Sequence, residues 1–452
     1  MTADELVRRA TALVNNFTDL NRVAAEGVRE IVSGRGVFVR DAAGGEFLDA
    51  VSGLWSASLG FSQEALVEAA TEQLARLPSY HIAADKATSP VLELCERLAQ
   101  VGPGQVTRVL LTNSGSEAND TQIKLLNYLW RWRGESGRTR FIARAGAFHG
   151  STLGAGSLSD LGASGHAFGL TLLDVARVSA PCRLWNGLPG ETEPEYVARL
   201  AAELEQTILQ LGPETVAGIF LEPVMGAGGI VVPPPGYYAA VQDVTRRHGV
   251  RLIADEVICG YGRTGRMWGC DTFGITPDST SCAKGITSGY LPLGAVLVDS
   301  EMDEALLGQS RRLGTFAHGF TTGGHPVTAA IALRTLDLFE EQKIVGNAAA
   351  MGALLHRELE QALQLPGVRD VRGIGLLAGV ELAGEDAQAR VQRVVTAAAS
   401  AGLIVRGLGK TVCLCPPLII NEEEVMLLVG LLLQALTTVA FSGSAAALRP
   451  DV

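Results

Sequence analysis

Five short apolar runs, separated by segments long enough to form helices, constrain the fold of this chain more than any other feature of its sequence. The runs are expected to be strands, and they lie at residues 109–112, 141–144, 218–223, 251–257 and 294–298. Strands that are apolar along their length and joined by helices are typical of a mostly parallel sheet covered on both faces. After Glu117, the residues Ile123, Leu126 and Trp130 recur at helical spacing, as in a helix that packs on such a sheet. The sequence therefore predicts an α/β fold.

The length of the chain and a change of pattern along it predict more than one domain. At 452 residues, the chain exceeds what one hydrophobic core usually holds. Val37, Val39 and Phe47 alternate around a glycine-containing turn, which predicts a hairpin near the N-terminus. We expect an N-terminal segment shared between a small domain and a subunit interface (1–62), a large domain (63–329), a smaller C-terminal α+β domain (330–440) and a tail (441–452).

Composition excludes several classes of partner. The net charge of −11 and the absence of a basic stripe argue against nucleic acid. The N-terminus does not resemble a secretory signal, and the apolar run at 425–433 is too short to span a bilayer, so no membrane association is expected. Asn421 and Glu424 predict a helix cap, which makes this run a buried helix face. Seven dispersed cysteines without a C-x-x-C pair favour the cytoplasm, and no histidine spacing suggests a metal site.

Two residues carry the clearest chemical signal. Asp255 ends an apolar run, at the sheet edge where ligands usually bind, and Lys284 lies 29 residues further on in a glycine- and serine-rich loop. A lysine can form a Schiff base, and an acid can keep a heterocyclic nitrogen protonated so that its ring takes up electrons. Upstream, Ser114, Gly115 and Ser116 form a turn into a helix, whose free N–H groups suit a phosphate. Together these residues predict a site for pyridoxal 5′-phosphate (PLP).

Taken singly, these features also have plainer interpretations. The turn could be an ordinary serine-capped helix start, Asp255 could be a helix cap or a metal ligand, and a loop lysine is commonly solvated. Other residues at strand ends favour a shared cleft: Phe148 with His149, then Glu222 and Val257, although a lone phenylalanine is as often a core residue. The turn at 321–326 is a further candidate for anion binding. The G-x-G-x-x-G match at 260–265 leaves an NAD-dependent dehydrogenase as an alternative, but no convincing helix follows it.

Seven stretches follow one another along the chain in this order: NSGSEANDTQIK, FHGST, EPVMGAGGIVVPP, ADEVICGYGRTGRMWG, AKGITSGYLPLGAV, HGFTTGGHP and VRGLGKTVCLCPPLII. They resemble the class III (omega-type) aminotransferases, and the resemblance extends over about residues 53–420. This resemblance implies PLP fold type I, the aspartate aminotransferase-like fold, with a large, mostly parallel-sheet domain and a smaller α+β domain.

The resemblance also implies roles for individual residues. Lys284 would hold the cofactor as a Schiff base and move the substrate proton, and Asp255 would pair with the pyridinium. Thr321 would reach the phosphate from a partner subunit, so we expect a homodimer or a dimer of dimers. Phe148 replaces the tyrosine of many relatives, which keeps the stacking surface and removes the phenol hydroxyl. The other cofactor-binding residues would be Ser114, Gly115 and Ser116 at the phosphate, Val257 and Phe148 at the ring, and His149 and Glu222 beside it.

Three residues resemble a subgroup, the pyruvate-dependent omega-transaminases. Leu54 and Trp55 would wall the substrate pocket, and Arg406 would meet the carboxylate of a keto acid through its bidentate fork. The predicted reaction is a ping-pong transfer from a primary amine or omega-amino acid to a keto acid, with pyruvate expected. Four alternatives stay open: a 2-oxoglutarate-dependent class III aminotransferase of diamine or amino-acid type, an aminomutase, a decarboxylating transaminase, and a non-catalytic binding protein on the same fold. Arg406 could also be a solvated strand-end residue.

Overall fold

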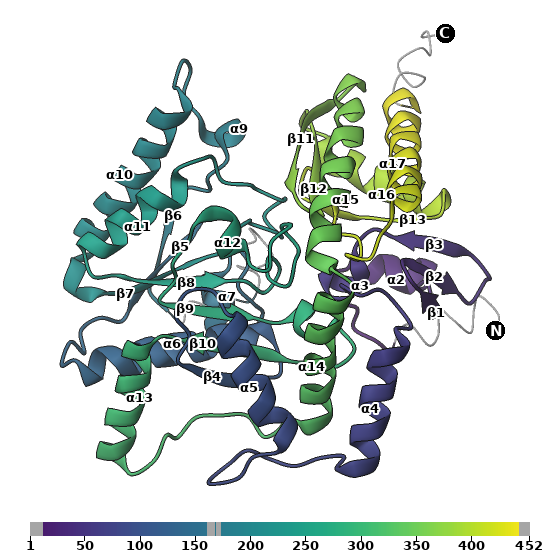
Figure 1. Cartoon of the computed structure of the whole chain (residues 1–452). Coiled ribbons are helices and arrows are strands. Elements are labelled where there is room, and N and C mark those ends of the chain that lie inside the picture. The colour runs from purple at the N-terminus through teal and green to yellow at the C-terminus, as the bar shows by residue number, and fades with distance from the viewer. Residues whose placement is uncertain (1–11, 161–167, 169–172, 443–452) are drawn as a thin grey trace, which may run out of the picture.

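A seven-stranded sheet forms the centre of the larger part of the molecule (Figure 1). The computed structural model describes residues 12–160, 168 and 173–442. The strand order is β4-β10-β9-β8-β7-β5-β6, and neighbouring strands are parallel except at β10, which is antiparallel to β4 and β9. The strands are β4 (Arg108–Thr112), β5 (Arg140–Arg144), β6 (Val175–Val178), β7 (Val216–Leu221), β8 (Arg251–Asp255), β9 (Ser279–Cys282) and β10 (Gly294–Val298). The five predicted strands are confirmed, whereas β6 and β9 were not predicted.

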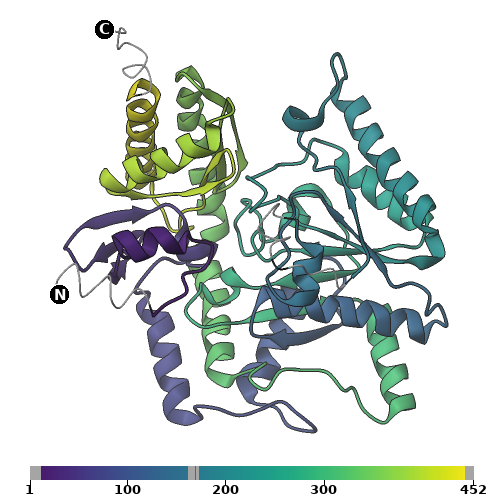
Figure 2. The same ribbon diagram turned by 180° about the vertical axis from the view of Figure 1, so that it is seen from behind.

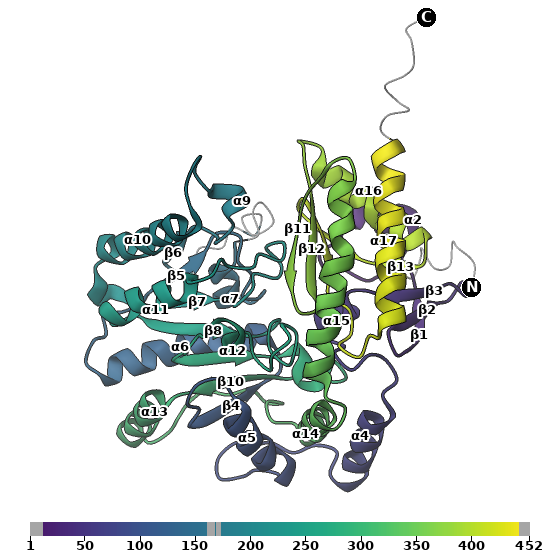
Figure 3. The ribbon, with the colours of Figure 1, turned by 45° about the horizontal axis from the view of Figure 1, so that its top comes forward.

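Helices cover both faces of this sheet, as the apolar strands predicted (Figure 3). On one face, α6 (Gly115–Trp132) buries Ile123, Leu126 and Trp130 in a cluster with Phe141 and Phe220. Alternate residues of the same strands point to the opposite face, where they join a second and larger cluster with side chains of several further helices. The helices around the sheet are α5 (Ser89–Val101), α7 (Leu153–Leu158), α9 (Arg183–Asn186), α10 (Glu193–Leu211), α11 (Tyr237–Arg247), α12 (Gly269–Phe273) and α13 (Ser300–Leu313).

The N-terminal region and the C-terminal region together form the smaller part of the molecule (Figure 2). The predicted hairpin is present as β2 (Phe38–Asp41) and β3 (Glu46–Asp49), preceded by β1 (Ile31–Arg35). Strand β3 then pairs in parallel with β13 (Leu403–Ile404), which joins the N-terminal segment to the C-terminal region. A separate antiparallel sheet has the order β11-β12-β15-β14, with β11 (Val368–Ile374), β12 (Leu377–Leu382), β14 (Arg406–Leu408) and β15 (Thr411–Leu414).

The remaining helices link and cover these two regions. The predicted domain boundary at residues 329 and 330 falls inside the continuous helix α14. Most of the predicted tail, residues 443–452, lies outside the described residues. These helices are α2 (Leu20–Glu26), α3 (Ser52–Trp55), α4 (Glu64–Arg76), α14 (Pro326–Glu341), α15 (Ile344–Leu359), α16 (Ala387–Ser400) and α17 (Glu422–Ser442).

Helix α17 is, within the described part of the chain, the one helix long and apolar enough to cross a membrane by length and composition. The predicted cap is present, since the Asn421 and Glu424 side chains each accept the other's backbone N–H at 2.9 Å. One face of the helix is buried through Val425, Leu428 and Leu432, and α17 packs beside α15 and α16 (Figure 3). The predicted buried helix face is therefore confirmed.

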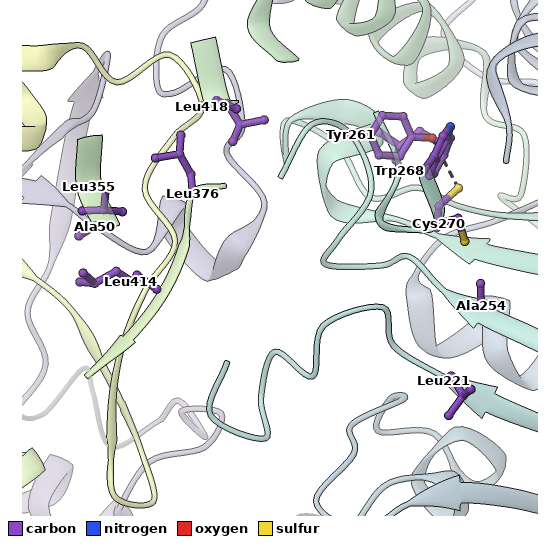
Figure 4. Packing of buried hydrophobic residues seen from close by; sticks show 14 of the residues in the cluster. Ala50, Leu221, Ala254, Tyr261, Trp268, Cys270, Leu355, Leu376, Leu414 and Leu418 are labelled. Carbon is purple, nitrogen blue, oxygen red and sulfur yellow. Dashed lines mark hydrogen bonds between the residues drawn. The ribbon is translucent and has the colours of Figure 1, made fainter. Parts of the chain in front are cut away.

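One continuous apolar cluster joins the large sheet to the C-terminal region, and the G-x-G-x-x-G segment lies within it (Figure 4). A Cβ at Gly262 would lie 3.1 Å from Leu418, and one at Gly265 would lie 3.2 Å from the backbone of Ala349 in α15. Both glycines also have positive φ, 86° in each case. The glycines therefore allow close packing of this loop against α15, and they are not at the start of a helix as a dinucleotide site requires.

Candidate active site

Asp255 and Lys284 lie at the same edge of the sheet and line one cavity of about 380 Å³. Asp255 is the last residue of β8, and its register partner Ser281 lies in β9, three residues before Lys284. A larger cleft of about 1190 Å³ lies between residues 264–272 and α15, but none of the predicted site residues lines it. The predicted residues that line the smaller cavity are Leu54, Ser114, Gly115, Ser116, Phe148, His149, Glu222, Asp255, Val257 and Lys284.

The Asp255 carboxylate is buried and held by three groups. Its Oδ2 accepts a hydrogen bond from Asn119 Nδ2 at 2.8 Å and lies 2.8 Å from His149 Nδ1, while Oδ1 accepts from Val257 N at 3.1 Å. Because a carboxylate only accepts, we assign the proton of this contact to His149 Nδ1. Asn119 also donates to the carbonyl oxygen of His149 at 2.6 Å, so the two residues that hold Asp255 are bonded to each other. The carboxylate is thus fixed at the cavity, where it can pair with a cationic ring nitrogen.

Lys284 opens the short 3₁₀ turn η2 (Lys284–Thr287) with a φ of 50°, in the left-handed region that non-glycine residues rarely adopt. Such strained residues cluster at functional sites. Burial lowers the pKa of the Lys284 amine, and the negative charge of Asp255 opposes this change. The lowered pKa favours the neutral amine, which is the form that attacks a carbonyl and accepts a proton.

The predicted phosphate turn begins helix α6. Ser114 caps the helix by accepting the Glu117 N–H at 3.1 Å, so the first N–H groups at Gly115 and Ser116 have no carbonyl partner within the helix. A Cβ at Gly115 would lie 2.8 Å from Val257 Cγ2, so the close approach of these two residues requires glycine. On the other side, Ser116 Oγ accepts the Ser151 N–H at 3.0 Å. This cradle of N–H groups fits a phosphate.

Phe148 and Glu222 line the cavity together. The two Glu222 carboxylate oxygens accept N–H groups from Phe148 (3.2 Å) and Gly226 (3.0 Å), and burial raises the pKa of this carboxyl. The ring of Phe148 meets Phe17 edge-on, with centroids 6.2 Å apart. Phe17 also lines the cavity and was not predicted, because nothing in its local sequence distinguishes it.

At the substrate end, Trp55 is buried and Leu54 is half exposed. The guanidinium carbon of Arg406 lies 5.6 Å from the ring centroid of Trp55 and 5.6 Å from that of Phe17. Burial lowers the pKa of Arg406, and among the described residues no carboxylate forms a salt bridge with it. Thr321 is exposed and does not line the cavity of its own chain, although the neighbouring Thr322 donates to Asn113 Oδ1 at 2.8 Å.

The sheet edge thus combines a buried acid, a strained and partly buried lysine and a helix N-terminus, which are the parts that a PLP-dependent enzyme needs. Comparison with known proteins shows the family: residues 22–436 match the aminotransferase class-III family, and the chain belongs to it. It is therefore a PLP-dependent transaminase. The residues present fit the cofactor, because Gly115 opens a cradle that any Cβ would fill and Asp255 presents its carboxylate to the same cavity.

Individual relatives are of two kinds. Gamma aminobutyrate transaminase 3, chloroplastic, of Solanum lycopersicum is 40% identical over 412 residues, which covers 87% of this chain and 78% of the relative. The crystal structure of a thermostable omega transaminase 4-fold mutant from Pseudomonas jessenii has a TM-score of 0.94 at 40% identity, covering 97% of this chain and 98% of that one. A PMP-bound aminotransferase from Vibrio fluvialis has a TM-score of 0.93 at 36% identity, covering 96% and 97%. The predicted family and fold are confirmed.

Proposed function

We propose that this transaminase transfers an amino group from a primary amine or omega-amino acid to pyruvate by a ping-pong mechanism. The observation that carries the choice of acceptor is Arg406, a partly buried guanidinium with no carboxylate partner in the described residues, beside Trp55 at the substrate end. A guanidinium fork is suited to the carboxylate of a small keto acid. The likeness to omega transaminases supports the same choice.

Two residues of the cavity, Lys284 and Asp255, would have separate roles in such a reaction. PLP, when bound, supplies an electron sink and holds the amino group between the two half-reactions. Lys284 Nζ, whose pKa is lowered by burial, removes the proton from the amine-bearing carbon of the donor and returns one to the acceptor carbon. Asp255, fixed by Asn119 and His149, keeps the ring nitrogen protonated.

Further residues bind and orient the cofactor and the substrate. We assign the phosphate to Ser114, Gly115 and Ser116, and the two faces of the ring to Phe148 and Val257. Leu54 lines the cavity at the substrate end, and Trp55 and Arg406 lie together beside it without lining it. Glu222 holds the Phe148 backbone in place.

Two further proposals concern assembly and location. Thr321 is exposed and lies outside its own chain's cavity, so we propose that it reaches a partner's phosphate in a homodimer. The seven free cysteines support a cytoplasmic location.

A second candidate is a class III enzyme of amino-acid type that uses 2-oxoglutarate. The several curated relatives named gamma-aminobutyrate transaminases, at about 40% identity, support an amino-acid donor, and their names do not give the acceptor. Steady-state kinetics separates the two. Initial rates are measured with varied amine at several fixed concentrations of pyruvate, and then of 2-oxoglutarate. Parallel double-reciprocal lines with pyruvate support the proposal. Turnover with 2-oxoglutarate alone would replace the acceptor, and intersecting lines would exclude the ping-pong order.

A further inference from the structure

The segment that carries Trp55 has an unusual backbone. Ser52, Gly53 and Trp55 have φ values of 49°, 67° and 62°, all in the left-handed region. Only glycine adopts this region without steric cost, so the conformation at Ser52 and Trp55 needs support from the surrounding structure. This segment, residues 51–55, is called the Trp55 turn below.

Asp49 supplies that support from inside the protein. Its Oδ1 accepts the N–H of Val51 at 2.9 Å, and its Oδ2 accepts the N–H of Gly53 at 2.6 Å. The side chain is buried, with 4% relative exposure of the residue, and no cation in the described structure pairs with it. A buried carboxylate without a cation is costly unless its hydrogen bonds are made, so both bonds matter for the turn. Burial accordingly raises the pKa of Asp49, which the two N–H groups only partly offset.

The backbone around Asp49 also fixes the strand that carries Arg406. Asp49 is the register partner of Ile404, and the Ala50 N–H bonds to the carbonyl oxygen of Ile404 at 3.0 Å. Arg406 follows two residues later in β14, and its guanidinium lies over the Trp55 ring. The turn and the strand that carries Arg406 are therefore fixed against each other at Asp49.

The ring of Trp55 has little freedom on its other side. A Cβ at Gly226 would lie 2.8 Å from Trp55 Cζ3, so the indole is packed directly against the backbone there. Because the Gly226 side is filled, a shift of the Trp55 turn would change the contact of the indole with Arg406 and the position of Leu54, which lines the cavity. The shape of the substrate end consequently depends on the two hydrogen bonds of Asp49.

We propose that Asp49 is a positioning residue for substrate selection, which holds Trp55 against Arg406. Asp49 would thereby determine how large an amine the enzyme accepts and where the keto-acid carboxylate binds. This inference deepens the proposed function and rests on it. Asp49 itself does not line the cavity, and its effect is exerted through the Trp55 turn.

The chain offers a matched control. Asp41, in DAAGG, accepts N–H groups from residues two and four positions on, as Asp49 does in DAVSG. Both bonds to Asp41 reach a single oxygen, Oδ1, so asparagine can keep them both and loses only the 3.8 Å ion pair of Oδ2 with Arg29. At Asp49 the two bonds reach different oxygens. Asparagine there keeps one bond and sets its NH₂ group against the other N–H.

The test compares Asp49→Asn with Asp41→Asn in the PLP-loaded enzyme. The readouts are the KM for the keto acid and the ratio of kcat/KM between a bulky aryl amine and isopropylamine. For Asp49→Asn we expect each to change about tenfold, which corresponds to about 1.4 kcal/mol, because the Gly53 or Val51 N–H left without an acceptor displaces the Trp55 turn. For Asp41→Asn we expect neither to change. The cofactor absorbance should stay the same in both variants.

A second variant guards against failure of Asp49→Asn to fold. Gly53→Ala keeps Asp49, and its Cβ would meet only Ser56 Oγ at an ordinary contact distance of 3.9 Å, but the φ of 67° disfavours any side chain. It should shift the same two readouts in the same direction. The inference is overturned if both variants keep the wild-type values, or if kcat falls equally for every amine. The amine ratio is measured with whichever keto acid supports wild-type turnover, so a wrong acceptor leaves this test intact.

Discussion

Replacing Gly115 by alanine tests the geometry of the cofactor cradle. The new Cβ would lie 2.8 Å and 2.9 Å from the two γ-carbons of Val257, well inside contact distance. Gly115 is the first residue of α6 and is not among the positive-φ glycines, so alanine introduces no backbone strain, and the effect is steric. Val257 would be pushed into the cavity, and its N–H, which bonds Asp255 at 3.1 Å, would move with it.

Overpacking of this kind costs about 1–3 kcal/mol. If this overpacking destabilises the PLP-bound enzyme and not the apoenzyme, the affinity for PLP should drop about tenfold to a hundredfold. The assay is titration of apoenzyme with PLP, followed by the cofactor absorbance, together with thermal unfolding of apo and loaded protein. Gly115→Ala combined with Val257→Ala should recover much of the loss, because the second change removes both γ-carbons. Gly430→Ala, where a Cβ meets open space, is the control and should bind PLP normally. Wild-type affinity in the Gly115→Ala variant, or no recovery in the double variant, would refute this reasoning.

Four further substitutions test other residues of the site and of the protein interior. Lys284→Ala should abolish turnover while PLP still binds in part, and Asp255→Asn should lower kcat by orders of magnitude; both are checked by steady-state rates on PLP-saturated enzyme. Arg406→Met should raise the KM for pyruvate by about tenfold to a hundredfold, through loss of a charge-assisted pair, and should spare an apolar amine. Burial raises the pKa of Glu256 to about 7 from an ordinary 4.5, so its proton stabilises the fold fully below about pH 4.5 and ceases to do so as the pH rises through 7. Between pH 5 and 8 the free energy of unfolding should therefore fall by up to about 3 kcal/mol more in the wild type than in Glu256→Gln, as measured by denaturant titration.

Much of the sheet and the centre of the site could be predicted from the sequence. Strands β7 and β8 are buried along their whole length, and this burial on both faces is what makes their sequences continuously apolar. A charged residue stands out where such a run stops, which is why Asp255 was found. Lys284 could be found for a similar reason, since a lysine flanked by alanine, glycine and isoleucine is unusual at a surface.

The unpredicted parts have a physical explanation as well. Strand β9 consists of serine, threonine and cysteine, and its burial between β8 and β10 comes from the sheet order and not from its own hydropathy. Asn119 and Phe17 act through contacts that local sequence does not reveal, as with the bond between Asn119 and Asp255 across 136 residues. The one sequence feature that could have revealed this bond is the polar residue Asn119 on the buried side of α6. The antiparallel direction of β10 could not be predicted either, because a wholly apolar strand gives the same pattern whether it runs parallel or antiparallel to its neighbours.

The most direct test of the account is a spectral half-reaction on the purified enzyme. Single amines are added to the PLP form until the cofactor absorbance changes to that of the aminated form, and pyruvate or 2-oxoglutarate is then added alone. The account predicts that primary amines or omega-amino acids convert the cofactor and that pyruvate restores the original absorbance. Restoration by 2-oxoglutarate and not by pyruvate would contradict the proposed acceptor, and no conversion by any amine would contradict the proposed transamination itself.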